Sequence, residues 1–89
     1  MEHLSELEAG SIKGALEALL LVSSDPVSAS QLAGVLGSTP GEIASLLADL
    51  KVEYEEANRG FQLREVAGGW RLFTHPAFHD QVESFVLSW

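Results

Sequence analysis

One stretch of the sequence, RGFQLREVAGGWRLFT at residues 59–74, most constrains what this chain can fold into. In its first half, apolar Phe61 and Leu63 alternate with polar neighbours, which is typical of a half-buried β-strand. Gly68 and Gly69 supply the positive φ angle that a tight hairpin loop requires. The stretch therefore predicts two short strands joined by a turn.

The register of this hairpin depends on where the turn lies. If Gly68 and Gly69 form the loop, Ala67 lies opposite Trp70. The core side then carries Phe61, Leu63, Trp70 and Leu72. The outer side carries Arg64, Val66, Arg71 and Phe73. A three-residue loop at residues 67–69 would instead place Glu65 opposite Arg71, a favourable cross-strand pair. We adopt the first register as the expectation. The second differs from it by one residue, and a slip of one residue exchanges the faces of one strand relative to the other.

The first of three helix patterns that precede the hairpin lies within residues 1–23. Its apolar residues recur at helical spacing: Ile12, Leu16, Leu19 and Leu20. Ser5 and Glu8 have the spacing of an N-terminal capping box. Gly10 weakens helix at this end, so the helix could start as late as Ser11.

The last turns of this first helix are apolar almost all round, because Ala18, Leu21 and Val22 widen the stripe. A helix of this kind is usually enclosed by neighbouring elements, which is the simpler interpretation. The alternative is that this end of the helix contacts a second subunit.

A second, short helix is expected after a turn at Pro26. Ser28 and Gln31 have capping-box spacing, and Gly37 occupies the usual position of a left-handed helix stop. Val27, before the cap, is expected to be extended. The apolar face of this helix is expected to consist of Leu32, Val35 and Leu36.

The third helix pattern has a clear start, with Thr39 as N-cap, Pro40 at the first position and Glu42 completing a capping box. It should run to about Ala57. Its core face consists of Ile43, Leu46, Leu47, Leu50 and Tyr54. Two helices joined by a short turn and followed by a hairpin describe a winged helix-turn-helix.

A last helix begins near His75 and Pro76, with an apolar stripe of Phe78, Val82, Phe85, Val86 and Trp89. The fold class is therefore mainly α with a small β-hairpin: three helices, a β-wing and a C-terminal helix. Residues 1–10 are expected to form a flexible or helical extension, and residues 11–89 the winged-helix domain. Because the apolar stripe is still running at the last residue, we expect the natural polypeptide to be longer.

The net charge argues against nucleic-acid binding. Thirteen acidic and five basic residues give a net charge of −8, whereas affinity for duplex DNA comes largely from Lys and Arg. In winged helix-turn-helix proteins that bind DNA, the third helix lies in the major groove. Here the outward positions of that helix are Glu42, Ser45, Asp49, Glu53 and Glu56, and Lys51 is the one cation in the helix. The hairpin carries arginines, but glutamates lie near them in sequence. Direct duplex binding, as by a transcription regulator, is thus the less favoured alternative.

Catalytic, metal and membrane functions find little support. His75 and His79 are four residues apart, with Asp80 and Glu83 nearby, but the HExxH context of a specific zinc pair is absent. A simple capping role suffices for His75. The serines lie at caps and turns rather than in a nucleophile elbow. The longest apolar run, at residues 18–22, is too short to cross a bilayer, and no secretory signal is evident. We expect a non-enzymatic protein without metal or cofactor.

Two parts of the sequence resemble the segregation and condensation protein B family. The first is EALLLVS followed by DPVS and QLA, within residues 17–33. The second and more specific is YE, RGFQL and EVAGGWRL, within residues 54–72. The resemblance covers residues 12–86. Leu21 stands where the family often has Phe, and Trp70 where Tyr is common, and both remain bulky and apolar.

This resemblance implies a winged-helix domain of a longer, two-domain protein. It also implies a non-catalytic subunit of a bacterial condensin-like complex. Family members form homodimers and bind a kleisin subunit, segregation and condensation protein A, which bridges the heads of the SMC ATPase. The expected location is therefore the cytoplasm, in association with the nucleoid through the complex.

Protein partners should meet apolar side chains beside arginine, because such residues dominate interface energetics. The first candidate surface is the outer face of the hairpin: Arg64, Val66, Arg71 and Phe73. The second comprises surplus apolar positions: Leu4, Leu7, Leu21, Phe85 and Trp89. For Phe73, Phe85 and Trp89 the alternative is ordinary core packing, since a small core must be covered first.

Overall fold

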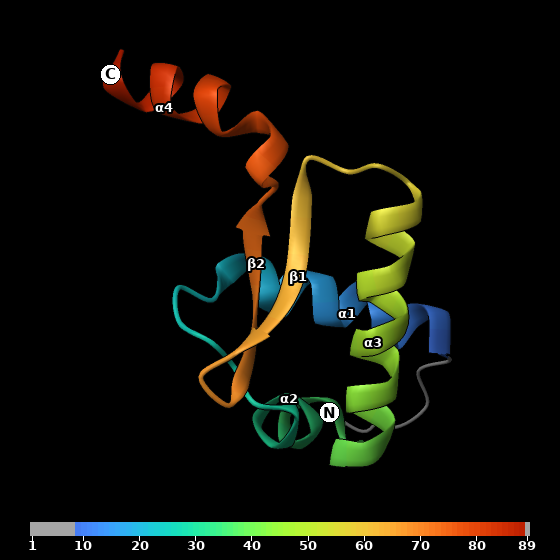
Figure 1. Ribbon diagram of the computed structural model, residues 1–89. Coiled ribbons are helices and arrows are strands. Elements are labelled where there is room, and N and C mark those ends of the chain that lie inside the picture. The colour runs from blue at the N-terminus through green and yellow to red at the C-terminus, as the bar shows by residue number, and fades with distance from the viewer. Residues whose placement is uncertain (1–8, 89) are drawn as a thin grey trace.

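The computed structural model describes residues 9–88 and has the expected winged helix-turn-helix architecture (Figure 1). In chain order its elements are α1 (Ala9–Val22), α2 (Ala29–Leu36), α3 (Pro40–Glu56), β1 (Phe61–Val66), β2 (Gly69–Thr74), the 3₁₀ helix η2 (Pro76–Phe78) and α4 (His79–Leu87). Several residues named above lie outside the described part: Leu4, Ser5, Leu7, Glu8 and Trp89. None of the helices within residues 9–88 is long and apolar enough to cross a membrane.

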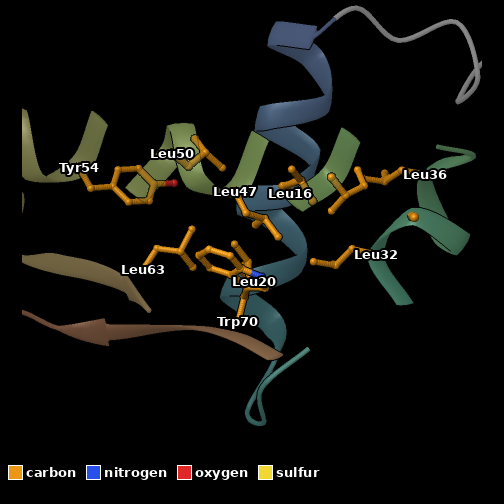
Figure 2. Packing of buried hydrophobic residues seen from close by; sticks show 11 residues of the cluster. Leu16, Leu20, Leu32, Leu36, Leu47, Leu50, Tyr54, Leu63 and Trp70 are labelled. Atoms are coloured by element: carbon orange, nitrogen blue, oxygen red, sulfur yellow. The ribbon is translucent and has the colours of Figure 1, made fainter. Parts of the chain in front are cut away.

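The core lies between the first three helices and the inner face of the hairpin. Figure 2 shows side chains from α1, α2, α3, β1 and β2 gathered in one cluster. Its buried members are Leu16, Leu20, Leu32, Ala33, Leu36, Ile43, Leu47, Leu50, Tyr54, Leu63 and Trp70. The helical stripes expected for α1 and α3 are confirmed, and Leu46 packs half-buried against the cluster.

The predicted helix caps on α2 are confirmed. Ser28 Oγ accepts a hydrogen bond from Gln31 N at 3.1 Å, and Gln31 Oε1 accepts one from Ser28 N at 2.9 Å. Gly37 ends the helix with a φ of 65°. The predicted apolar face of α2 is wrong at one position: Val35 is 55% exposed, whereas Ala33 is buried. The buried face is centred near Leu36 and extends toward Ala33, which leaves Val35 at its exposed margin.

The start of α3 is also confirmed, with one difference. Thr39 Oγ1 accepts a hydrogen bond from Glu42 N at 3.2 Å, and Pro40 occupies the first turn. The Glu42 carboxylate accepts instead from the Ser38 hydroxyl at 3.1 Å. The expected capping box is thus replaced by a bond to the residue before the cap.

The hairpin has a different register from both predicted ones. Its loop is Ala67–Gly68, with φ angles of 50° and 75°, and Val66 pairs with Gly69. Positive φ at both loop positions is the requirement of the tight turn that matches strand twist. Relative to our first register the pairing is shifted by two residues, and a shift of two leaves the faces unchanged. Leu63 and Leu72 therefore still face the core together.

Gly69 lies outside the turn, and another segment of the chain passes close to it. A Cβ at this position would lie 2.9 Å from Pro26 C and 2.9 Å from Val27 N. Here Val27, extended as expected, forms an isolated antiparallel bridge with Trp70. The two glycines thus have separate roles. Gly68 takes the positive φ angle that the turn requires, and Gly69, which has no Cβ, leaves room for the neighbouring backbone.

The last helix projects away from the body of the domain (Figure 1). No residue within α4 is buried, and Phe85 is 63% exposed, so the core-packing alternative for Phe85 is wrong. His75 caps the preceding 3₁₀ turn as expected, since its Nδ1 accepts a hydrogen bond from Ala77 N at 3.0 Å.

Replacing Gly69 by Ala tests the close approach between this residue and the Pro26–Val27 backbone. We expect the free energy of unfolding to fall by about 1–3 kcal/mol, because the new Cβ forces the Pro26–Val27 backbone away. Gly34→Ala in α2 is the matched control, since its Cβ meets nothing within 4 Å and should add about 0.5–1 kcal/mol of stability. Urea denaturation of both variants measures the difference. A Gly69→Ala variant as stable as the parent would contradict the packing.

Candidate partner-binding surface

The outer face of the hairpin brings together two arginines and one aromatic ring. Arg64 and Arg71 are directly opposite each other in the register. Their guanidinium carbons lie 5.2 and 5.0 Å from the centroid of the Phe73 ring. We call these three residues the arginine–phenylalanine cluster. Of the four outer-face residues predicted, the structure gathers three, while Val66 lies on the same face beside the turn.

The cluster holds two like charges close together without neutralising them. Directly opposed like charges destabilise a sheet, and cation–π attraction of about 0.5–1 kcal/mol each at exposed sites offsets this in part. Within residues 9–88 no salt bridge joins Arg64 or Arg71 to a carboxylate. The face is therefore a local positive site, with an aromatic platform, on an acidic chain.

The C-terminal end of α1 presents apolar side chains to solvent. Leu21 is 75% exposed and Val22 is 82% exposed, so the interpretation of α1 as an enclosed helix is wrong at this end. The reason is that Leu16 and Leu20 already fill the contact with the core, which leaves the opposite side of the helix uncovered. We call Leu21 and Val22 the α1 tip.

A groove of about 490 Å³ runs between the C-terminal half of α1 and β2. Its wall includes Leu20, Leu21, Phe61, Arg71, Leu72 and Phe73. The groove therefore connects the α1 tip to the arginine–phenylalanine cluster. Sequence reasoning named both surfaces separately and missed the groove, because it forms between segments far apart in the chain.

Two polar contacts join α1 to α3, and the residues of the first, Tyr54 and Glu17, line the groove. Tyr54 Oη donates a hydrogen bond to Glu17 Oε2 at 2.6 Å, and Lys13 Nζ forms an ion pair with Glu53. Burial, reinforced by the Glu17 carboxylate, raises the pKa of Tyr54. The hydrogen bond to Glu53 raises the pKa of Lys13. Tyr54 also packs edge-on against Phe61, with ring centroids 4.9 Å apart.

The outward face of α3 is acidic, as the sequence indicated. Its exposed residues include Glu42, Ser45, Asp49, Glu53 and Glu56. In winged helices that read DNA, this helix supplies cations to phosphates and bases. Here it presents mainly carboxylates, which repel a polyanion.

The histidine pair does not converge on a metal site. His75 Nδ1 is engaged in the helix cap, and His79 Nε2 lies 3.5 Å from Glu83 Oε2. In the described part of the chain, no three His, Asp or Glu side chains come together as metal ligands would.

Comparison with known proteins identifies relatives of this arrangement. A family model described as "Segregation and condensation complex subunit ScpB" matches residues 14–88. Segregation and condensation protein B of Moorella thermoacetica is 41% identical over 84% of this chain, which covers 38% of that relative. The corresponding protein of Symbiobacterium thermophilum is 44% identical over 76% of this chain and 31% of its own length. The chain thus spans well under half the length of these relatives.

Solved structures agree with the fold. The crystal structure of ScpB from Mycobacterium tuberculosis matches with a TM-score of 0.89 and 35% identity, over 92% of this chain and 51% of that one. A crystal structure described as a dimer of the ScpB N-terminal domain complexed with ScpA peptide matches with a TM-score of 0.81 and 28% identity. That match covers 85% of this chain and 95% of the other.

The Tyr54–Glu17 contact predicts a specific dependence of stability on pH. In the unfolded chain Tyr54 loses its proton near pH 10, whereas the folded chain retains it to higher pH. The stability that this residue contributes is therefore complete below about pH 10 and is lost as the pH rises through the folded pKa. Lys13, whose pKa is also raised, adds to the same alkaline decline.

Replacing Tyr54 by Phe should make the decline of stability at alkaline pH shallower, while the contribution of Lys13 to that decline remains. At neutral pH the variant should lose about 1 kcal/mol, because the Glu17 carboxylate loses its hydroxyl donor. Urea denaturation at several pH values measures both effects. An equally steep decline in the Tyr54→Phe variant would show that another group causes it.

Proposed function

The chain belongs to the family of segregation and condensation complex subunit ScpB, and we propose that it acts as a non-catalytic protein-interaction module in chromosome condensation and segregation. The family name supplies the process. The module's role is to hold other polypeptides together rather than to carry out a reaction. The observation that carries this proposal is the groove, which is open and largely apolar and connects the α1 tip to the arginine–phenylalanine cluster.

The partners in this proposal are a second copy of the chain and the kleisin subunit ScpA. Support comes from the similar solved ScpB domain, described as a dimer with an ScpA peptide, which this chain matches over 95% of that domain. The exposed α1 tip suits self-association, because apolar side chains at 75% and 82% exposure gain from being covered. The mixed apolar and cationic groove suits a peptide.

The wider assembly is part of the same proposal. Through ScpA the chain would join the SMC ATPase, and the complex would act in the cytoplasm on the nucleoid. The chain itself does not bind the duplex, because the carboxylates exposed on α3 repel phosphate. The part of the longer relatives that this chain does not cover would share the binding of ScpA.

Light scattering and peptide titration test this function. The chain should self-associate and should bind a segment of ScpA from the same organism. Leu21→Asp should weaken self-association at least tenfold, because it places a charge in an apolar contact. Val52→Asp on α3 is the matched control: Val52 is 51% exposed, lies outside the groove and should change neither property.

A different set of results would contradict the proposed function. A chain that stays monomeric at high concentration, binds no ScpA segment and shifts duplex DNA with a steep salt dependence would make it a transcription regulator instead. Phe73→Asp provides an independent check, because Phe73 is half-buried on the outer face of the hairpin and outside the buried core cluster. It should weaken partner binding while the helical circular dichroism stays unchanged.

A further inference from the structure

The outer edge of β2 is covered at one residue and open beyond it. Val27 N donates a hydrogen bond to Trp70 O at 2.9 Å, and Trp70 N donates one to Val27 O at 2.7 Å. The sheet otherwise contains β1 and β2 alone within the described residues, so no strand continues beside β2 after this bridge. The edge from Arg71 to Thr74 therefore remains open.

The bonds of Trp70 determine which backbone groups this edge presents. Backbone groups of successive residues in an antiparallel strand face opposite sides, so every second residue faces the same side as Trp70. Leu72 and Thr74 consequently direct their N–H and C=O groups to the outer edge. No described backbone group bonds to them there. The edge thus offers donors and acceptors at the spacing of a β-ladder.

The same alternation sorts the side chains of any strand that pairs with this edge. Residues opposite Leu72 would point with it toward α1 and enter the groove, where Leu20 and Phe61 provide apolar contact. Residues opposite Arg71 and Phe73 would point to the outer face of the hairpin. There they would meet the arginine–phenylalanine cluster.

The charges around the groove favour acidic residues in the pairing strand at the positions that point to the outer face of the hairpin. Arg64 and Arg71 have no carboxylate partner within residues 9–88, and each is ready to form a charge-assisted hydrogen bond. The carboxylate of Glu17 also borders the groove, but it accepts the Tyr54 hydroxyl at 2.6 Å and lies on the α1 side. Positive charge is therefore concentrated on the β2 side.

We propose that the open edge of β2 receives an extended segment of the partner polypeptide, in which apolar side chains alternate with acidic ones. The segment adds a strand to the sheet next to Leu72 and Thr74, its apolar side chains enter the groove, and its carboxylates bind Arg71 and Arg64. The inference rests on the proposed function, in which the partner is ScpA, and specifies the chemistry by which that partner is recognised.

The first test separates main-chain pairing from side-chain contact. Labelled peptides that tile ScpA of the same organism are titrated into the 89-residue chain. The peptide that binds should alternate apolar and acidic residues. Thr74→Pro should weaken it about tenfold, because proline removes an N–H that faces the edge and not β1. Thr74→Val keeps that N–H and should bind as the parent does.

The second test concerns charge. Arg71→Gln should weaken the same peptide about tenfold and reduce the dependence of its affinity on salt. Arg59→Gln removes an equal charge from an exposed position before β1 and should have little effect. Circular dichroism of all four variants tests whether they fold alike. If Thr74→Pro does not fold, amide N-methylation of the bound peptide at alternate residues provides the same test from the partner's side.

Several outcomes would overturn the inference and leave the proposed function intact. One is an ScpA peptide that binds equally to Thr74→Pro and Thr74→Val, or equally to Arg71→Gln and Arg59→Gln. Another is loss of self-association, but not of peptide binding, in Thr74→Pro, which would assign the edge to a second copy. Competition by duplex DNA for the bound peptide would assign the arginines to phosphate, and it would also contradict the proposal that the chain does not bind the duplex. Failure of every ScpA peptide to bind the parent chain would overturn both proposals.

Discussion

The close contact between Gly69 and the Pro26–Val27 backbone organises this small domain. A Cβ at residue 69 would lie 2.9 Å from that backbone, so the segment between α1 and α2 can lie against the hairpin because the residue there is glycine. The contact brings Val27 into hydrogen bonding with Trp70, and Trp70 closes the core. A domain of this size buries roughly 60% of its unfolded surface, so one such junction matters to the whole core.

The same junction explains which surfaces remain open. Val27 is followed at once by the Ser28 cap of α2, so the third strand consists of a single bridge and the edge of β2 beyond it is uncovered. On α1, Leu16 and Leu20 pack into the core, and Leu21 and Val22 remain exposed on the other side of the helix. An open strand edge is normally an aggregation hazard. Here Arg64 and Arg71, which have no carboxylate partner within residues 9–88, lie near this edge on a chain of net charge −8, which favours an acidic partner over a second edge of the same kind.

Much of the fold could be predicted because its signals are local. The Ser28 and Thr39 caps, the Gly37 stop and the period-two pattern of the hairpin each act within a few residues. The predicted register of the hairpin was wrong because the role of Gly69 depends on a segment some forty residues earlier in the chain, which no local pattern reveals. The Tyr54–Glu17 and Lys13–Glu53 contacts, 37 and 40 residues apart, were missed for the same reason. The arginine–phenylalanine cluster was anticipated because the shift of two residues preserves the faces, whereas the groove and the open edge required the assembled structure.

Residue-resolved amide hydrogen exchange of the free, monomeric chain tests most directly whether one bridge anchors the fold and leaves the adjoining edge open. We expect slow exchange at Val27 and Trp70, together with the buried helices. We expect exchange at Leu72 and Thr74 to be much faster than at Arg71 and Phe73, which bond to β1. Slow exchange at all four positions of β2 beyond the bridge, or fast exchange at Val27, would contradict the proposed anchor and open edge.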